Sequence, residues 1–354
     1  MAGSNKIVGS IPNKIEKALA LIEDVDIHPV DIVADCGLST IFAGSEGGST
    51  QYDDEKHLTS IADLYVSQPL DETSSLLDDY KSVINAFVKF VDQKKTMLFV
   101  GDILRHVFVQ GVSKKTLSDK SKNFSNNIYW PIRHLTSTFN TSYGTMYANW
   151  GSVYDHASKK HVWIPSSGIM SSIMAKSDES SAPWAAPAGF DRGVVNGLTD
   201  ISTYYNQTER DNLYSISINT IANFPDDGFV VFGQKTLQTK PSAFDRVNVR
   251  RLFLHLEKIT YQTVKYFVFE PNTYTTRSNV VNVLDPIFAL ARDSLVQGIY
   301  DYKLVCDKSN NSPDVIDSNE LIVDVFIKPT RTAEFVLVNF YATRTNQSFS
   351  ELVS

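Results

Sequence analysis

The sequence predicts a mixed α+β and α/β protein with more than one domain. Its 354 residues exceed twice the ~150 residues of a typical single domain. The N-terminal half contains a strand, a long helix and a second strand in succession, which is typical of a parallel α/β layer. The last third combines two amphipathic helices with short strands, which predicts two helices packed against a mostly antiparallel sheet.

Composition and charge exclude several classes of protein. The chain is 42% hydrophobic and 21% charged, so it can bury ordinary cores and is not an intrinsically disordered chain. The formal net charge of -7 argues against nucleic acid as a partner, because nucleic-acid binders usually carry a basic surface. No stretch approaches the ~18 apolar residues of a membrane-spanning helix, and the N-terminus lacks the apolar core of a signal peptide. We therefore expect a soluble chain that does not insert into membranes.

Hydrophobic spacing predicts the first elements. Residues 14–23 repeat apolar positions at helical intervals and predict a short amphipathic helix. Residues 30–37 predict a strand that ends at a glycine, and residues 44–59, glycine-rich and then acidic, predict a surface loop. Residues 76–91 show the clearest helical repeat of the N-terminal half, and residues 96–100 follow as a buried strand.

The middle of the chain is less regular. Residues 112–128 are polar and lysine-rich and predict a loop. Residues 138–150 are interpreted as a short helix that carries aromatic side chains. Residues 152–155 and 161–164 flank a turn and predict a hairpin. Residues 177–200 concentrate Ser, Pro and Gly, so we expect no regular element there, only a domain junction or a long interface loop.

The last third has clearer patterns. Alternating polar and apolar residues predict a half-buried strand over 215–219, and a turn at 226–228 precedes a second strand over 229–233. Ser242 is interpreted as the N-cap of the next helix. That helix is expected to direct Val249, Leu252, Phe253 and Leu256 inward and Arg246, Arg250 and Arg251 outward. A second helix is expected over 287–297, followed by strands at 300–307, 321–328 and 334–342.

No catalytic, cofactor or metal site is predicted. Residues 228–236 nearly spell a phosphate-binding loop, but Gln234 stands where that motif needs lysine. His28, Asp31, Asp35 and Cys36 lie close in sequence, yet no further ligand follows at metal spacing. Cys36 and Cys306 are interpreted as small packing residues. Two alternatives remain: an α/β hydrolase or transferase that uses Cys36 or Ser45, and a carbohydrate- or receptor-binding surface module.

Two further features have both a structural and a functional interpretation. Arg246, Arg250 and Arg251 form either a solvated helix face or a docking face for an acidic protein surface. The strand Phe335–Ala342 is apolar on both faces, so it is either a central strand or an edge that pairs with another chain. On one face lie Phe335, Leu337 and Tyr341, and on the other Val336, Val338 and Phe340.

Several ordered blocks of sequence resemble the tail sheath proteins of contractile-tailed bacteriophages. The blocks are SYGTMYANWGSVYDHASKKHVWIPSSG (142–168), APWAAPAGFDRGVVNGLTDI (182–201), INTIANFPDDGFVVFGQKTL (218–237), FDRVNVRRLFLHLEKI (244–259) and the closing segment 299–343. Phe232 stands where the family usually has Trp. Upstream, DIVADCGLS (31–39) is loosely similar to a family motif, with Cys36 in place of Pro.

The resemblance implies a structural protein without active site or cofactor. Its subunits would form stacked hexameric rings, a helical polymer around the tail tube protein, and would contract to drive the tube through the host envelope. The baseplate and the tail terminator are further expected partners. The protein would assemble in the host cytoplasm and reside in the virion. The arginine helix would contact tube or sheath neighbours, and strand 335–342 would pair with a neighbouring subunit.

The resemblance also suggests a division of the chain into three parts. Residues 1–26 would be an N-terminal helix or the remnant of an arm, and we expect the chain to be a fragment that lacks the full arm. Residues 27–200 would form an outer or middle α/β domain, with a variable insertion at 44–130. Residues 201–354 would form the inner C-terminal domain.

Overall fold

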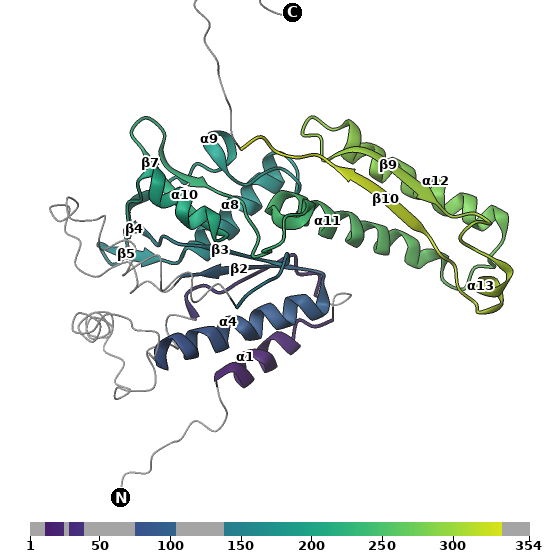
Figure 1. Cartoon of the computed structure of the whole chain (residues 1–354), viewed down its shortest axis with the longest axis horizontal. Coiled ribbons are helices and arrows are strands. Elements are labelled where there is room, and N and C mark those ends of the chain that lie inside the picture. The colour runs from purple at the N-terminus through teal and green to yellow at the C-terminus, as the bar shows by residue number, and fades with distance from the viewer. Residues whose placement is uncertain (1–10, 25–27, 39–74, 104–137, 335–354) are drawn as a thin grey trace, which may run out of the picture.

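A computed structural model describes residues 11–24, 28–38, 75–103 and 138–334 of the chain (Figure 1). Its centre is a five-stranded sheet in the order β1-β2-β3-β7-β8. The first four strands run parallel to their neighbours, and the last pairs antiparallel. The strands are β1 (Ile32–Ala34), β2 (Leu98–Asp102), β3 (Gly144–Tyr147), β7 (Ile218–Phe224) and β8 (Gly228–Phe232).

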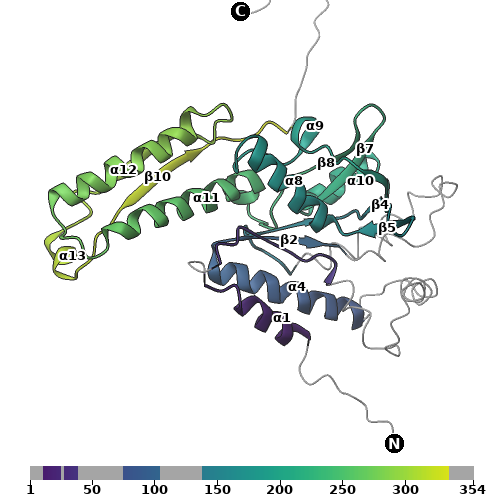
Figure 2. The same ribbon diagram turned by 180° about the vertical axis from the view of Figure 1, so that it is seen from behind.

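Helices cover both faces of this sheet, which explains why its central strands are apolar on both sides. One face packs against α1 (Ile11–Ala20) and α4 (Ser75–Lys94), which Figure 2 shows side by side below the sheet. On β2, Phe99 faces the cluster that includes these helices, while Leu98 and Val100 face the opposite cluster. That second cluster contains the buried side of α8 (Ser166–Ser180).

The N-terminal elements agree with the sequence-based expectation. The strand β1, the helix α4 and the strand β2 follow one another, and β1 pairs in parallel with β2 at Val33 and Phe99. This is the crossover unit that the apolar spacing predicts. The predicted hairpin is also confirmed as β4 (Gly151–Asp155) and β5 (Lys160–Ile164), which belong to a second sheet with β6 (Leu198–Ile201).

Three local predictions in the middle of the chain are wrong. Residues 144–147 form strand β3 and not a helix, because pairing with β2 on one side and β7 on the other buries the whole segment. The stretch 177–200 is not irregular throughout, since it contains the end of α8, the short helix α9 (Gly189–Arg192) and the start of β6. Residues 215–217 are not strand; they end helix α10 (Gln207–Ser215), and β7 begins only after the turn at Ser217.

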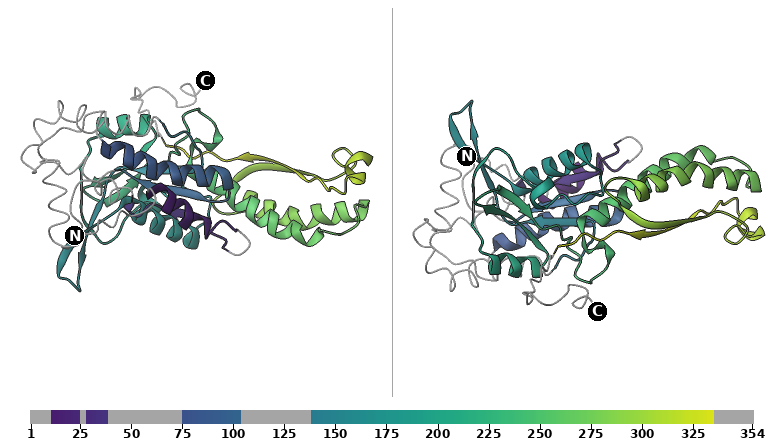
Figure 3. Two further views of the ribbon diagram at one scale, coloured as in Figure 1. Left: turned by 90° about the horizontal axis from the view of Figure 1, so that it is seen from below. Right: turned by 90° about the horizontal axis from the view of Figure 1, so that it is seen from above.

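An elongated arm, defined here as residues 247–329, extends away from these sheets (Figures 1 and 3). It consists of α11 (Val247–Val264), the 3-10 turn η4 (Lys265–Phe267), α12 (Tyr274–Asp293), β9 (Ile299–Val305), α13 (Pro313–Asp317) and β10 (Asp324–Pro329). The strands β9 and β10 form an antiparallel two-stranded sheet. The predicted module of two helices and an antiparallel sheet is therefore confirmed, and with it the mixed fold class.

Helix boundaries in the arm differ from the prediction. Ser242 caps the 3-10 turn η3 (Ala243–Asp245), and the N-cap of α11 is Arg246. Helix α12 begins earlier than expected and ends four residues before Gln297, even though it contains Pro286. The division of the chain at residue 200 stays a prediction; the five-stranded sheet takes β3 from one side of that boundary and β7 from the other.

Candidate functional site

Arg250 is buried and not on a solvated helix face. Its side chain is 6% exposed, and its guanidinium lies 4.1 Å from the ring centroid of Tyr143 and 4.0 Å from that of Phe244. One guanidinium nitrogen donates a hydrogen bond to Ser142 at 2.6 Å. Burial lowers the pKa of Arg250, and the neighbouring Tyr143 opposes that effect. A cation between two aromatic faces in a desolvated site stabilises the packing of α11 on the sheet.

Arg251 is also committed to an internal partner. It is 6% exposed, and its guanidinium donates to both carboxylate oxygens of Asp178 on α8, at 2.7 and 2.5 Å. This pair joins the first turns of the arm to a helix that covers the five-stranded sheet. Both hydrogen bonds come from the single nitrogen Nη2, and a charge-assisted contact of this kind is stronger than one between neutral groups.

Arg246 lies at the base of the arm and is half-buried. It donates from Nε and Nη2 to the two carboxylate oxygens of Glu334, at 2.6 and 2.9 Å, and it also pairs with Asp245 at 3.1 Å. The prediction that Arg246, Arg250 and Arg251 all point outward is therefore wrong for Arg250 and Arg251. The helical spacing is correct, but neighbouring elements supply aromatic and acidic partners that cover this face.

The base of the arm contains a second contact that the sequence alone does not identify. The indole nitrogen of Trp184 donates to the carbonyl of Val296 at 2.6 Å, and its ring packs in the same cluster as Leu252 and Phe288. Gly298 lies against that ring, because a Cβ built on it would approach the indole to 2.8 Å. Trp184 therefore links the arm to the segment that follows α8.

The strand predicted over residues 335–342, with Phe335, Val336, Leu337, Val338, Phe340 and Tyr341, falls on residues outside the described part of the chain. What the structure describes is the sheet that such a strand could join. Within the described chain, β9 and β10 pair only with each other, so each has one edge without a strand partner. Unpaired edges present rows of N–H and C=O groups that favour strand addition.

The structure gives no support to a thiol nucleophile at Cys36. The residue is exposed, so the prediction that it is a small packing residue is wrong, whereas Cys306 is buried as predicted. Although the residue as a whole is exposed, partial desolvation of its sulfur, and then the charges of Asp102 and Asp35, raise the pKa of the Cys36 thiol. A nucleophilic cysteine needs the opposite shift. The other candidate, Ser45, lies outside the described residues.

Asp102 is a fully buried carboxylate near Cys36, and its partners are structural. It is fully buried at the end of β2 and accepts hydrogen bonds from Ser166 and Ser167 at the start of α8, and from Gly37. Burial raises the pKa of Asp102, while these donors act in the opposite direction. The arrangement fixes the junction of β1, β2 and α8.

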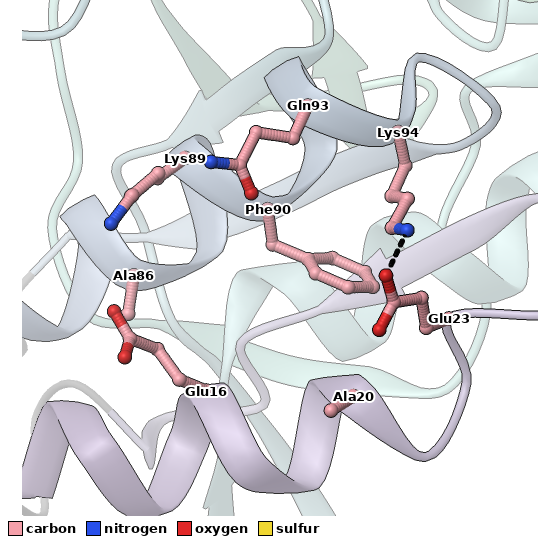
Figure 4. Close-up of a pocket in the computed structure, with 8 residues that line it drawn as sticks. All are labelled: Glu16, Ala20, Glu23, Ala86, Lys89, Phe90, Gln93 and Lys94. Atoms are coloured by element: carbon pink, nitrogen blue, oxygen red, sulfur yellow. Dashed lines mark hydrogen bonds and ion pairs between the residues drawn. The ribbon is translucent and has the colours of Figure 1, made fainter.

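The described residues contain no group of three His, Cys, Asp or Glu side chains that could hold a metal ion. Gly228–Phe232 is a strand, and Lys235 donates to the carbonyl of Tyr214. A shallow pocket of about 230 Å³ lies between α1 and α4, where Lys94 pairs with Glu23 (Figure 4). Its lining includes no Ser, Thr, Cys or His side chain. No helix in the described part has the length and apolar character to cross a membrane.

Known proteins match the chain from residue 112 to residue 343. Residues 112–237 match the family described as the phage tail sheath protein central domain, and residues 239–343 match the phage tail sheath C-terminal domain. The chain is 38% identical to the tail sheath protein of Vibrio phage KVP40 over 60% of its own length and 31% of that protein. It is 36% identical to the tail sheath protein of Enterobacteria phage T4 over 62% of its length and 33% of that protein.

The fold agrees with these matches. A chain of the anti-feeding prophage helical sheath in its contracted state superposes with a TM-score of 0.57 and 22% identity, over 87% of this chain and 82% of that chain. The fold and the sequence define a structural protein of a contractile tail. The chain belongs to the phage tail sheath family. Its matched region spans about a third of the length of the curated relatives.

Proposed function

We propose that this chain is the polymerising subunit of a contractile tail sheath, which assembles as stacked hexameric rings around a tail tube and contracts to drive the tube through the host envelope. The observation that carries the proposal is the match of two consecutive sheath domains over residues 112–343. In this proposal the protein is a component of the virion and assembles in the host cytoplasm. It acts without an enzymatic reaction or a cofactor.

The arm supplies the physical basis for polymerisation. The two-stranded sheet of β9 and β10 has an unpaired edge on either side within the described chain. A two-stranded sheet is only marginally stable by itself, so it gains when further strands are added. The apolar strand 335–342 of a neighbouring subunit is the proposed addition. Every subunit would thereby be both donor and acceptor, which produces an open helical array.

The energy for contraction would come from the array itself. An extended lattice that buries less interface than the contracted lattice would release free energy when it rearranges, because buried apolar area stabilises an assembly. No nucleotide is required in this scheme. The tail tube protein is the proposed internal partner, and the baseplate and tail terminator are proposed partners at the two ends.

The arginines of α11 have an indirect role in this proposal. Arg250 and Arg251 are buried, and Arg246 binds Glu334. They would support a sheath- or tube-contacting surface from inside, by fixing α11 to the sheet. We therefore propose that charge reversal at Arg250 and Arg251 weakens assembly mainly through misfolding of the arm.

Electron microscopy of the purified 354-residue chain tests the proposed function. Rings, tubes or long helical polymers are expected as concentration rises. A chain that stays strictly monomeric at all salt and protein concentrations would contradict the proposal. Cys36→Ala and alkylation of Cys36 test the hydrolase or transferase alternative. Assembly should be unchanged in both cases, whereas loss of a hydrolytic or transfer activity in the variant would favour an enzyme.

A further inference from the structure

The arm begins and ends at the same ion pair. Arg246 is the N-cap residue of α11, where the chain enters the arm, and Glu334 lies five residues after β10, where the chain has left it. The two side chains meet in a two-point contact, with Nε to Oε1 at 2.6 Å and Nη2 to Oε2 at 2.9 Å. One ion pair at the base of the arm therefore joins the residue where the chain enters the arm to the segment where the chain leaves it.

This pair is partly shielded from water. The side chain of Arg246 is 25% exposed and that of Glu334 is 18% exposed. The Tyr214 ring lies beside the pair, with its centroid 5.8 Å from the Arg246 guanidinium and 4.4 Å from the Lys235 ammonium. Asp245 adds a second anion. Charge-assisted contacts of this type are stronger than those on an open surface.

The segment that carries Glu334 has no regular structure of its own. Residues 330–334 form neither helix nor strand, so side-chain contacts determine their course. Thr330 is held at Gly298, where its N–H and its hydroxyl both donate to the carbonyl oxygen at 3.0 Å. Thr332 accepts a hydrogen bond from the side chain of Gln234 at 2.6 Å. Glu334 is the last of these three fixed points.

We propose that the Arg246–Glu334 pair is a latch that sets the direction in which the C-terminal segment leaves the body. The inference rests on the proposed function, in which residues 335–342 pair with a neighbouring subunit. A segment with a fixed starting direction loses less conformational entropy when it binds, because fewer orientations are given up. Arg246 and Glu334 are positioning residues, and they act through the segment that follows them.

The two parallel hydrogen bonds to Glu334 require arginine at residue 246. Arginine meets both carboxylate oxygens at once, whereas lysine provides one compact charge that cannot form the same two parallel bonds. Arg246→Lys therefore keeps the net charge but loses the two-point contact. Glu334→Gln keeps the shape of residue 334 but removes its charge. Asp293→Asn is the matched control, since Asp293 binds Arg292 in a similar two-point contact on the exposed end of α12.

Hydrogen exchange on the unassembled chain tests the latch directly. We expect Glu334→Gln and Arg246→Lys to accelerate exchange at the Thr330 amide by about tenfold, because local opening of residues 330–334 no longer has to break the pair. Asp293→Asn should leave that amide unchanged. Electron microscopy should then show fewer or irregular polymers for the two latch variants and normal polymers for the control.

The exchange and microscopy results test the latch, its effect on assembly and the proposed function separately. If exchange at Thr330 stays at the wild-type rate in both latch variants, the pair does not fix this segment and the latch is wrong. If exchange accelerates but polymers remain normal in number and form, the direction of the segment does not control assembly. If the wild-type chain forms no polymer at all, the proposed function fails, and the exchange data still decide whether the latch exists.

Discussion

The carboxylate of Asp102 accepts a hydrogen bond from the backbone N–H of Ser167 at 2.6 Å and thereby caps helix α8 from a different element. The residue at the N-cap position, Pro165, makes no side-chain cap of its own. Asp102 ends strand β2, so the sheet provides the cap that the local sequence lacks. A carboxylate at a helix N-terminus meets free N–H groups and the positive end of the helix dipole.

Asp102→Asn should destabilise the protein by about 1–3 kcal/mol. The carboxylate accepts from Gly37 and Ser167 through Oδ2 and from Ser166 and Ser167 through Oδ1. An amide has one accepting oxygen, so one set of donors would face its NH2 group. Urea unfolding measures the loss, and a free energy of unfolding equal to that of the wild type would contradict this account.

The stability of the wild-type protein should also depend on pH through Asp102. Burial raises the pKa of Asp102 in the folded chain above the value of about 4 that it has in the unfolded chain. Between these two pKa values the folded chain binds a proton at Asp102 and the unfolded chain does not. The protonation of Asp102 therefore contributes to the free energy of unfolding in full below the unfolded pKa, and this contribution is lost as pH rises through the folded pKa. Subtracting the pH profile of Asp102→Asn from that of the wild type isolates this group. A difference that is flat, or that increases with pH, would contradict the assignment.

Arg250→Ala should lower the free energy of unfolding by about 2–4 kcal/mol, because two desolvated cation–π contacts are lost. The rings concerned are those of Tyr143 and Phe244. Arg292→Ala is the control, since Arg292 lies at the exposed end of α12 and surface pairs contribute little. Thermal unfolding of both variants measures the difference. Equal midpoints would place Arg250 on a solvated face, as the helical spacing alone suggested.

Gly298→Ala should loosen the junction between the arm and the body. A Cβ at this position would lie 2.8 Å from the Trp184 ring, so either the indole or the chain must move, at a cost of about 1–3 kcal/mol. Gly168→Ala is the control, because a Cβ there meets nothing within 4 Å. Tryptophan fluorescence and thermal unfolding check both variants. A wild-type midpoint for Gly298→Ala would show that the contact relaxes without strain.

Much of the fold is predictable from local patterns. The helical repeat of residues 76–91 and the strand at 96–100 predict the crossover that forms α4 and β2. The turn between 152–155 and 161–164 predicts the hairpin. These elements can be predicted from the sequence because apolar periodicity is a property of residues close together in the chain. The helix predicted at residues 144–147 is a strand in the structure, because its conformation depends on pairing with β2 and β7, which lie far away in sequence.

The candidate site was predictable only in part. The sequence identifies the arginines of α11 and places Trp184 in a motif shared with sheath proteins. It does not identify Asp178 or Glu334, since nothing in the local pattern connects residue 178 with 251 or residue 334 with 246. Both acidic residues reach the helix only after the chain has folded back on itself.

The sequence by itself determined the family and the succession of most helices and strands, because both are encoded in short blocks and in the period of apolar residues. The tertiary structure alone decided which charges face solvent. A helix pattern places Arg246, Arg250 and Arg251 on one side but cannot say what covers that side. Two aromatic rings and two carboxylates cover it, and all of them except the adjacent Phe244 come from elements distant in the sequence. Arg250 and Arg251 are therefore buried contacts that fix the arm, and the docking role of this helix stays a prediction.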